Sequence, residues 1–92
     1  MEHSPLDVTW KGTPLVPTKA AMDELFKYGL DLNDVLAVLE EGKPSGRARK
    51  KGVFEYCLER GGFAVKVVVA ESLDVFNKRD CWAVVHVGRV KT

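Results

Sequence analysis

The residues of this sequence that are best suited to chemistry lie in its C-terminal half. Cationic side chains neutralise phosphate, an indole ring stacks on a nucleic-acid base, and histidine exchanges protons near neutral pH. All three types occur here. The candidates for phosphate and base contacts are Arg47, Arg49, Lys51 and Trp82, and those for proton transfer are His86 and Lys66. Together they predict a surface that binds nucleic acid and carries acid–base chemistry.

The charge distribution supports this prediction. Residues 1–42 carry three basic and eight acidic side chains, whereas residues 43–92 carry eleven basic and five acidic ones. The net charge of +1 therefore hides a C-terminal half of charge +6. Such an asymmetry favours an anionic partner, either RNA or an acidic protein.

Familiar metal and cofactor motifs are absent from the sequence. The segment 42–46 looks like a phosphate loop, but it follows a predicted helix instead of preceding one, and Pro44 removes a backbone donor. No HExxH, EF-hand or GxSxG pattern occurs. The two cysteines are too few for a disulfide scaffold and lack zinc-site spacing, so we expect free thiols, no metal and no cofactor.

Length and hydropathy bound the class of protein. A chain of 92 residues with 46% hydrophobic residues supports one domain with one core. No apolar run approaches the roughly 20 residues of a transmembrane helix, and residues 1–5 have no signal-peptide pattern. We therefore expect a cytoplasmic protein, either a monomer or a homodimer.

Two amphipathic helices are predicted within residues 17–42. Thr18 and Asp31 can cap their N-termini, because the side-chain oxygens accept hydrogen bonds from free backbone N–H groups. Gly29 can take the left-handed conformation that ends the first helix. Apolar residues at three- and four-residue steps predict the buried face of this helix, formed by Met22, Leu25, Phe26 and Leu30.

From residue 43 onward the apolar period changes from 3.6 to 2, which predicts strands. The basic residues 47–51 fit an exposed edge strand, because charge there prevents unwanted pairing. Residues 53–60 and 63–70 form a predicted hairpin around Gly61-Gly62. Alternation predicts that Phe54, Tyr56 and Leu58 face the helices.

A long loop at residues 71–80 and a last strand at residues 81–87 complete the predicted sheet. Lys66 marks the less buried side of the preceding strand. By comparison with it, we assign an outward-facing set on the last strand, formed by Trp82, Val84 and His86.

Together, these helices and strands predict a single α+β domain spanning residues 1–92. A short N-terminal strand or arm (1–16) precedes the helical hairpin (17–42) and the sheet (43–92). We expect the helical hairpin to pack on one face of a three- to four-stranded antiparallel sheet, in the order α-α-β-β-β-β.

This order resembles the small uncharacterised prokaryotic domains grouped with the RelE-type toxin superfamily. The resemblance spans residues 17–88 and depends on Thr-Lys-Ala-Ala at residues 18–21, Tyr-Gly-Leu-Asp-Leu-Asn-Asp-Val at residues 28–35 and a glycine before the basic strand. The family's first helix carries His-Ala-x-x-Arg, whereas Ala20 and Glu24 stand at its His and Arg positions here.

The resemblance implies a toxin–antitoxin setting, RNA as the ligand, and metal-independent cleavage. RNA-cleaving members use basic and aromatic residues on the sheet as phosphate clamps and proton donors. The residues of this chain that are similar in kind are Arg47, Arg49, Lys66 and His86.

Two classes of function stay open. The first is an RNA-binding module or metal-independent endoribonuclease, with His86 and Lys66 as its catalytic residues. The second is a non-catalytic interaction protein that uses the basic edge strand to bind an acidic partner, or the face of Trp82 and Val84 to form a homodimer. A third possibility assigns no function, with Trp82 packed under the N-terminal stretch and His86 an ordinary strand residue.

Overall fold

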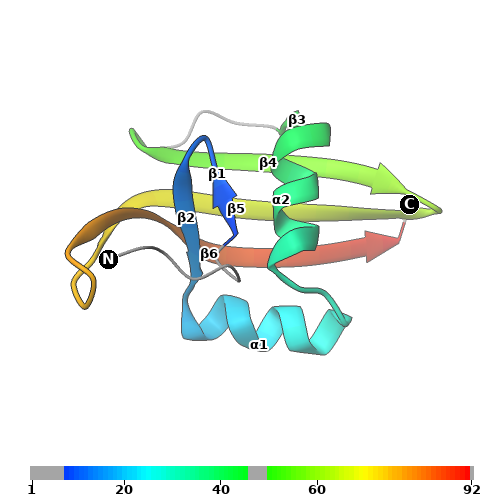
Figure 1. The fold of residues 1–92 in the computed structure, drawn as a ribbon. Helices are drawn as coiled ribbons and strands as arrows, with labels where there is room; N and C mark the ends of the chain where they lie inside the picture. Colours follow the sequence, from blue (N-terminus) through cyan, green and yellow to red (C-terminus); the bar gives the residue numbers. More distant parts are fainter. Residues whose placement is uncertain (1–7, 46–49, 92) are drawn as a thin grey trace.

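The computed structural model describes residues 8–45 and 50–91, which form two helices and a six-stranded sheet (Figure 1). The elements are, in chain order, β1 Thr9–Trp10, β2 Thr13–Pro17, α1 Lys19–Tyr28, α2 Leu32–Glu41, β3 Lys43–Pro44, β4 Val53–Arg60, β5 Phe63–Asp74 and β6 Arg79–Lys91. The α+β class is confirmed. None of the helices described is long and apolar enough to cross a membrane.

The prediction of a three- to four-stranded antiparallel sheet is wrong. The strand order is β1-β2-β6-β5-β4-β3, and β2 runs parallel to β6 while the other neighbours are antiparallel. The N-terminal segment supplies the parallel pair, in which Leu15 lies opposite Trp82. β1 has two residues, and β2 has five, of which Pro14 and Pro17 are two. Such short strands give a weak period-2 signal, so the sequence pattern predicted too few strands.

The sheet curls around its core. Trp10 of β1 packs edge-on against Tyr56 of β4, with ring centroids 5.7 Å apart, although three strands separate β1 from β4 in the sheet order. Figure 1 shows α2 and the β1–β2 hairpin on the same face of the sheet, with α1 beside β6. The central residues of β5 and β6 on this face, Val67, Val69, Val84 and Val87, are fully buried.

The two helices and their caps are those predicted, but the helices do not pack against each other as a hairpin on one face of the sheet: α1 lies beside β6, while α2 runs across the strands in a different direction (Figure 1). Thr18 Oγ1 accepts a hydrogen bond from the N–H of Ala21 at 3.1 Å. Asp31 accepts from the N–H of Asp34 at 3.0 Å, within a reciprocal capping box. Gly29 adopts the left-handed conformation, with φ of 69°. Local side-chain chemistry therefore determines where both helices begin.

The predicted buried face of α1 is partly wrong. Ala21 and Leu25 are buried, but Met22 is exposed and Phe26 is 92% exposed. The helix contacts β6 and β2 and lies at the side of the sheet. It therefore buries a narrower stripe than helical periodicity suggests.

The prediction of a loop over residues 71–80 is also wrong. β5 continues to Asp74 and β6 begins at Arg79, so only a four-residue turn joins them. By contrast, the hairpin turn at Gly61 and Gly62 is confirmed, with φ of 59° and 84°.

A β-bulge in β6 overturns half of the predicted outward face. Val68 pairs with His86 and Val69 pairs with Val84, which leaves Val85 as an extra residue. The extra residue interrupts the alternation, so Val84 and Trp82 point toward the core while His86 points away from it. The outward assignment is correct for His86 and wrong for Trp82 and Val84.

Candidate functional site

Two of the predicted site residues share the face of the sheet that points away from α2. We call this the outer face, defined by the side chains Glu55, Cys57, Lys66, Val68 and His86. The ladder places Val68 between Glu55 and His86, and it places Lys66 opposite Gly88. Val68 is buried, whereas Lys66 and His86 are exposed. The two candidate catalytic side chains therefore occupy adjacent rows of one surface.

A carboxylate from α1 orients His86. Nδ1 of His86 lies 3.0 Å from Oε2 of Glu24, and Oε1 of the same carboxylate accepts the backbone N–H of Val87 at 2.8 Å. The backbone contact fixes the carboxylate at the edge of β6. An Nδ1–H that donates to Glu24 leaves Nε2 of a neutral imidazole as the acceptor.

Gly88 gives the imidazole ring its space. A Cβ atom at Gly88 would lie only 3.2 Å from Nε2 of His86, so the ring lies over a position without a side chain. Lys66 is the cross-strand neighbour of this glycine. The ring and the lysine thus flank the same backbone position on the outer face.

Lys66 is paired with a carboxylate on its other side. Its Nζ lies 3.6 Å from Oε2 of Glu55, which also accepts a hydrogen bond from the Ser45 hydroxyl at 2.6 Å. The Glu55 side chain is only 10% exposed, while that of Lys66 is 46% exposed. The ammonium is therefore held near the outer face while it stays accessible to solvent.

This arrangement suits proton transfer better than simple anion binding. Lys66 and His86 each have a carboxylate beside them, which lowers the positive potential that a phosphate meets. The same carboxylates hold the imidazole and the ammonium in position, which is what general acid–base catalysis needs. The outer face thus offers an oriented base and an adjacent cation.

The other predicted nucleic-acid contacts are not part of this group. Arg47 and Arg49 lie outside the described residues. Lys51 is exposed in the turn before β4. Trp82 packs on the core side against Trp10, with ring centroids 5.0 Å apart, and its indole N–H donates to the carbonyl of Trp10 at 3.1 Å.

Sequence reasoning missed Glu24 and Gly88. Glu24 is separated from Val87 by 63 positions, so only the packing of α1 beside β6 brings them together. The local sequence pattern gave no signal for Glu24, because its partners lie on a strand far along the chain. Gly88 had a weak signal, as an isolated glycine in a strand often marks a close approach.

Nothing in the described part of the chain suggests a metal site, since no three His, Cys, Asp or Glu side chains gather there. Comparison with protein-family models, curated proteins and solved structures finds no match. The resemblance to RelE-type toxins therefore stays a prediction.

Proposed function

We propose that this chain binds RNA on the outer face and cleaves it without a metal, with His86 as the base. The observation that carries this proposal is the Glu24–His86 pair, 3.0 Å apart, on the same surface as Lys66. The resemblance to RelE-type toxins and the charge of +6 in residues 43–92 point to the same ligand.

The proposed reaction is an intramolecular transfer at a phosphodiester. Nε2 of His86 takes the proton of the ribose 2′-hydroxyl, and the 2′-oxygen forms a bond to the adjacent phosphorus. The bond from phosphorus to the 5′-oxygen breaks, and Lys66 neutralises the phosphate and gives a proton to that oxygen. The products are a 2′,3′-cyclic phosphate and a 5′-hydroxyl end.

Glu24 acts in this scheme as a positioning residue. Its carboxylate stabilises the imidazolium that forms when His86 takes the proton, and it keeps Nε2 directed away from α1. A toxin–antitoxin setting in the cytoplasm belongs to the same proposal. The two free cysteines, Cys57 and Cys81, suit a reducing compartment.

The test is cleavage of a single-stranded oligoribonucleotide by the purified protein in the presence of EDTA. We expect His86→Ala to lower the rate at least about 100-fold, in the range of a lost general base. His3→Ala removes the other histidine of the chain and is the matched control. Glu24→Gln is expected to lower kcat with little change in KM, since it acts through His86.

A substrate with one 2′-deoxyribose tests the nucleophile. We expect no cleavage at that linkage and unchanged binding. Cleavage that needs a divalent ion, or that survives His86→Ala, contradicts the catalytic proposal. RNA binding that does not weaken with salt contradicts the phosphate contacts as well.

Binding without cleavage would retain only the RNA-binding part of the proposal. In that case Lys66→Gln should weaken binding more than Lys19→Gln, a matched change at an exposed lysine of α1. Equal effects of the two changes would show that the outer face is not the RNA surface.

A further inference from the structure

The strand ends next to the β4–β5 turn carry an arginine stacked on an aromatic ring. Cζ of Arg89 on β6 lies 3.9 Å from the ring centroid of Phe63 on β5. Both side chains are exposed, that of Phe63 to 36%. Figure 1 shows these ends of β5 and β6 extending past α2. A guanidinium plane is therefore held at the surface, on the strands that also carry Lys66 and His86.

The pair lies on the core side of the sheet, just beyond the core. Arg89 is two positions from the fully buried Val87 and therefore projects on the same side of β6. Phe63 lies opposite Lys91 in the ladder, and Lys91 is exposed as well. His86 projects on the outer face, about 10 Å away along β6 at roughly 3.3 Å per residue. The edge of one strand thus separates the stacked arginine from the proposed base.

The charge of Arg89 is not neutralised by a carboxylate of the described residues. Its side chain contacts the phenyl ring and forms no ion pair in residues 8–45 and 50–91. Carboxylates on the surrounding elements have other partners or lie on the outer face, namely Glu24, Asp34, Glu41 and Glu59. The guanidinium is therefore available to an anionic ligand, unlike Lys66 and Arg60, which are each paired with a glutamate.

The edge of β6 beside the pair is open. The ladder between β2 and β6 ends at Pro17 and Val84, and no other strand of the described chain pairs with this edge. Glu24 of α1 accepts the N–H of Val87 there. Since N–H groups two residues apart in an antiparallel ladder point to the same edge, the N–H of Arg89 also points away from β5. An extended chain can therefore cross this edge from the outer face to Arg89.

A stacked arginine of this kind suits a single-stranded nucleic acid. One face of the guanidinium lies on the phenyl ring, and the other face can stack on a nucleobase. Its N–H groups can donate to a phosphate oxygen at the same time. Trp82 is not available for stacking, because it packs on the core side against Trp10. Arg89 therefore offers the stacking surface that the outer face lacks.

We propose that the Arg89–Phe63 pair stacks on a base of the bound RNA, close to the linkage that lies at His86. The inference rests on the proposed function, because the RNA reaches Arg89 from the outer face across the edge of β6. Phe63 orients the guanidinium, and Lys91 adds positive charge beside it. Stacking tolerates every base, so the contact adds affinity and fixes the position of the strand without a strict sequence preference.

Two oligonucleotides of equal length test the proposal by fluorescence anisotropy. One is a 2′-O-methyl oligoribonucleotide, and the other has the same backbone with every base removed. We expect the wild-type chain to bind the first about 10-fold or more tightly than the second, as for a stacked base. Arg89→Lys keeps the charge and loses the planar group, so it should lower this ratio at least about 5-fold and leave binding of the abasic backbone nearly unchanged.

The aromatic ring has its own variant and control. Phe63→Leu should lower the ratio as Arg89→Lys does, because the guanidinium loses the ring that orients it. Phe76→Leu, at an exposed ring in the β5–β6 turn, and Arg60→Lys, at an exposed arginine bound by Glu41, should leave the ratio unchanged. All of these side chains are exposed, and circular dichroism checks that every variant stays folded.

Lys66→Gln separates this inference from the proposed function. It should weaken binding of both oligonucleotides and leave their ratio unchanged, since Lys66 contacts phosphate. An unchanged ratio in Arg89→Lys, or an equal loss in Phe76→Leu or Arg60→Lys, would overturn the stacking inference. The proposed function would survive that result if Lys66→Gln still weakened binding. No RNA binding by the wild-type chain would overturn both, and binding of polyglutamate through Arg89 in its place would indicate an acidic protein partner.

Discussion

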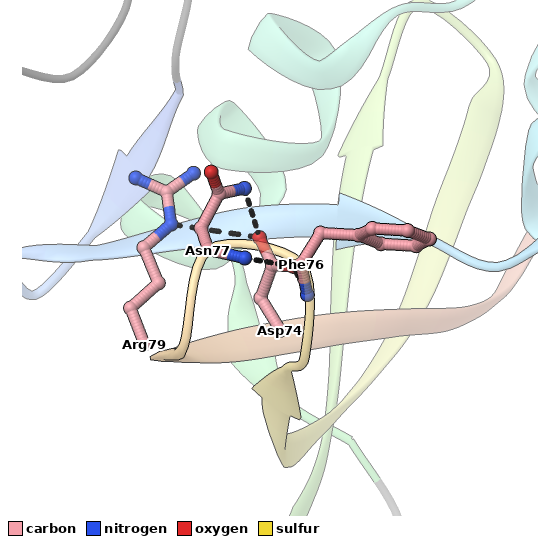
Figure 2. A network of polar contacts seen from close by, with 4 residues as sticks. All are labelled: Asp74, Phe76, Asn77 and Arg79. Atoms are coloured by element: carbon pink, nitrogen blue, oxygen red, sulfur yellow. Dashed lines mark hydrogen bonds and ion pairs between the residues drawn. The ribbon is translucent and has the colours of Figure 1, made fainter.

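The long β5–β6 hairpin is stabilised differently at its base and at its tip. In the base, Val67, Val69, Val84 and Val87 are fully buried beneath α2 and the curled N-terminal strands. In the hairpin tip, which comprises residues 73–79, the apolar side chains Leu73, Val75 and Phe76 are exposed, and Asp74 accepts the hydrogen bonds that order the turn (Figure 2). One pair of strands therefore combines a core element with a presented surface.

The difference shows what each region is suited to do. Burial of valines on one side of the base holds the strands firmly enough to fix Lys66 and His86 on the other side. The tip lies beyond the core and contributes little burial, so its apolar residues are available for contacts. The base can therefore position side chains on the outer face, whereas the tip presents its side chains to solvent.

The largest effect should come from Trp82→Ala. This change removes ring contacts with Trp10 and Phe54 and a hydrogen bond to the carbonyl of Trp10. We expect a loss of about 3 kcal/mol in the free energy of unfolding, measured by urea denaturation. Phe76→Ala, at an aromatic residue of the tip, should stay within about 0.5 kcal/mol of wild type. Similar losses for both would show that base and tip are not distinct.

The next effect tests the bulge through two adjacent valines. Val84 is fully buried and Val85 is 37% exposed. We expect Val84→Ala to cost about 2 kcal/mol and Val85→Ala less than about 0.5 kcal/mol. Thermal and urea denaturation give both values. Equal costs would contradict the register that places Val84 inward and His86 outward.

A smaller effect is expected at the edge of β6. Glu24→Ala leaves the N–H of Val87 without its carboxylate acceptor, which should cost about 1 kcal/mol. Asp23→Ala, at the neighbouring exposed carboxylate of α1, should cost less than about 0.5 kcal/mol. Amide exchange should quicken at Val87 in the Glu24 variant alone. If the exchange rate of the Val87 amide did not change in the Glu24 variant, the positioning role of Glu24 would be contradicted.

The smallest effect concerns acid pH at the tip. The amide of Asn77 donates to Asp74 and lowers the pKa of its carboxyl below the usual value of 3.8, with further lowering by the backbone N–H groups and Arg79. Because the pKa is lowered in the folded chain, the contribution of Asp74 to stability is complete above about pH 3.8, the ordinary value. It is lost as the pH falls through the lowered pKa. An NMR titration of the carboxyl carbon should therefore have its midpoint below 3.8.

Asn77→Ala tests the cause of this shift. It should move the midpoint upward toward the ordinary value, because the largest favourable contact is lost. A midpoint that does not move would show that the network in Figure 2 does not hold the tip in solution.

Local signals predicted much of the fold. Thr18, Asp31 and Gly29 act through neighbouring backbone groups, so their roles follow from the sequence. The size of the sheet did not follow, because β1 and β2 are short and their pairing with β6 is long-range. The bulge at Val85 leaves no mark in the residue pattern, and it reversed the assignment of Trp82 and Val84.

The positions of the candidate site residues were likewise predictable only in part. The outward positions of Lys66 and His86 were predicted, because a polar side chain in an apolar strand marks the outward side. Glu24 was not found, since it belongs to a helix more than 60 positions away. Tertiary packing, and not the local sequence pattern, supplies the residue that orients His86.

The most direct test of the central claim is to map RNA on the protein by NMR. The ¹⁵N-labelled protein is titrated at low salt with a 2′-O-methyl oligoribonucleotide, which binds but has no free 2′-hydroxyl to react. We predict that the largest chemical-shift changes cluster at Lys66, His86 and Gly88 on the outer face, and that the hairpin tip is unaffected. Changes confined to the tip, or no changes at low salt, would contradict the account.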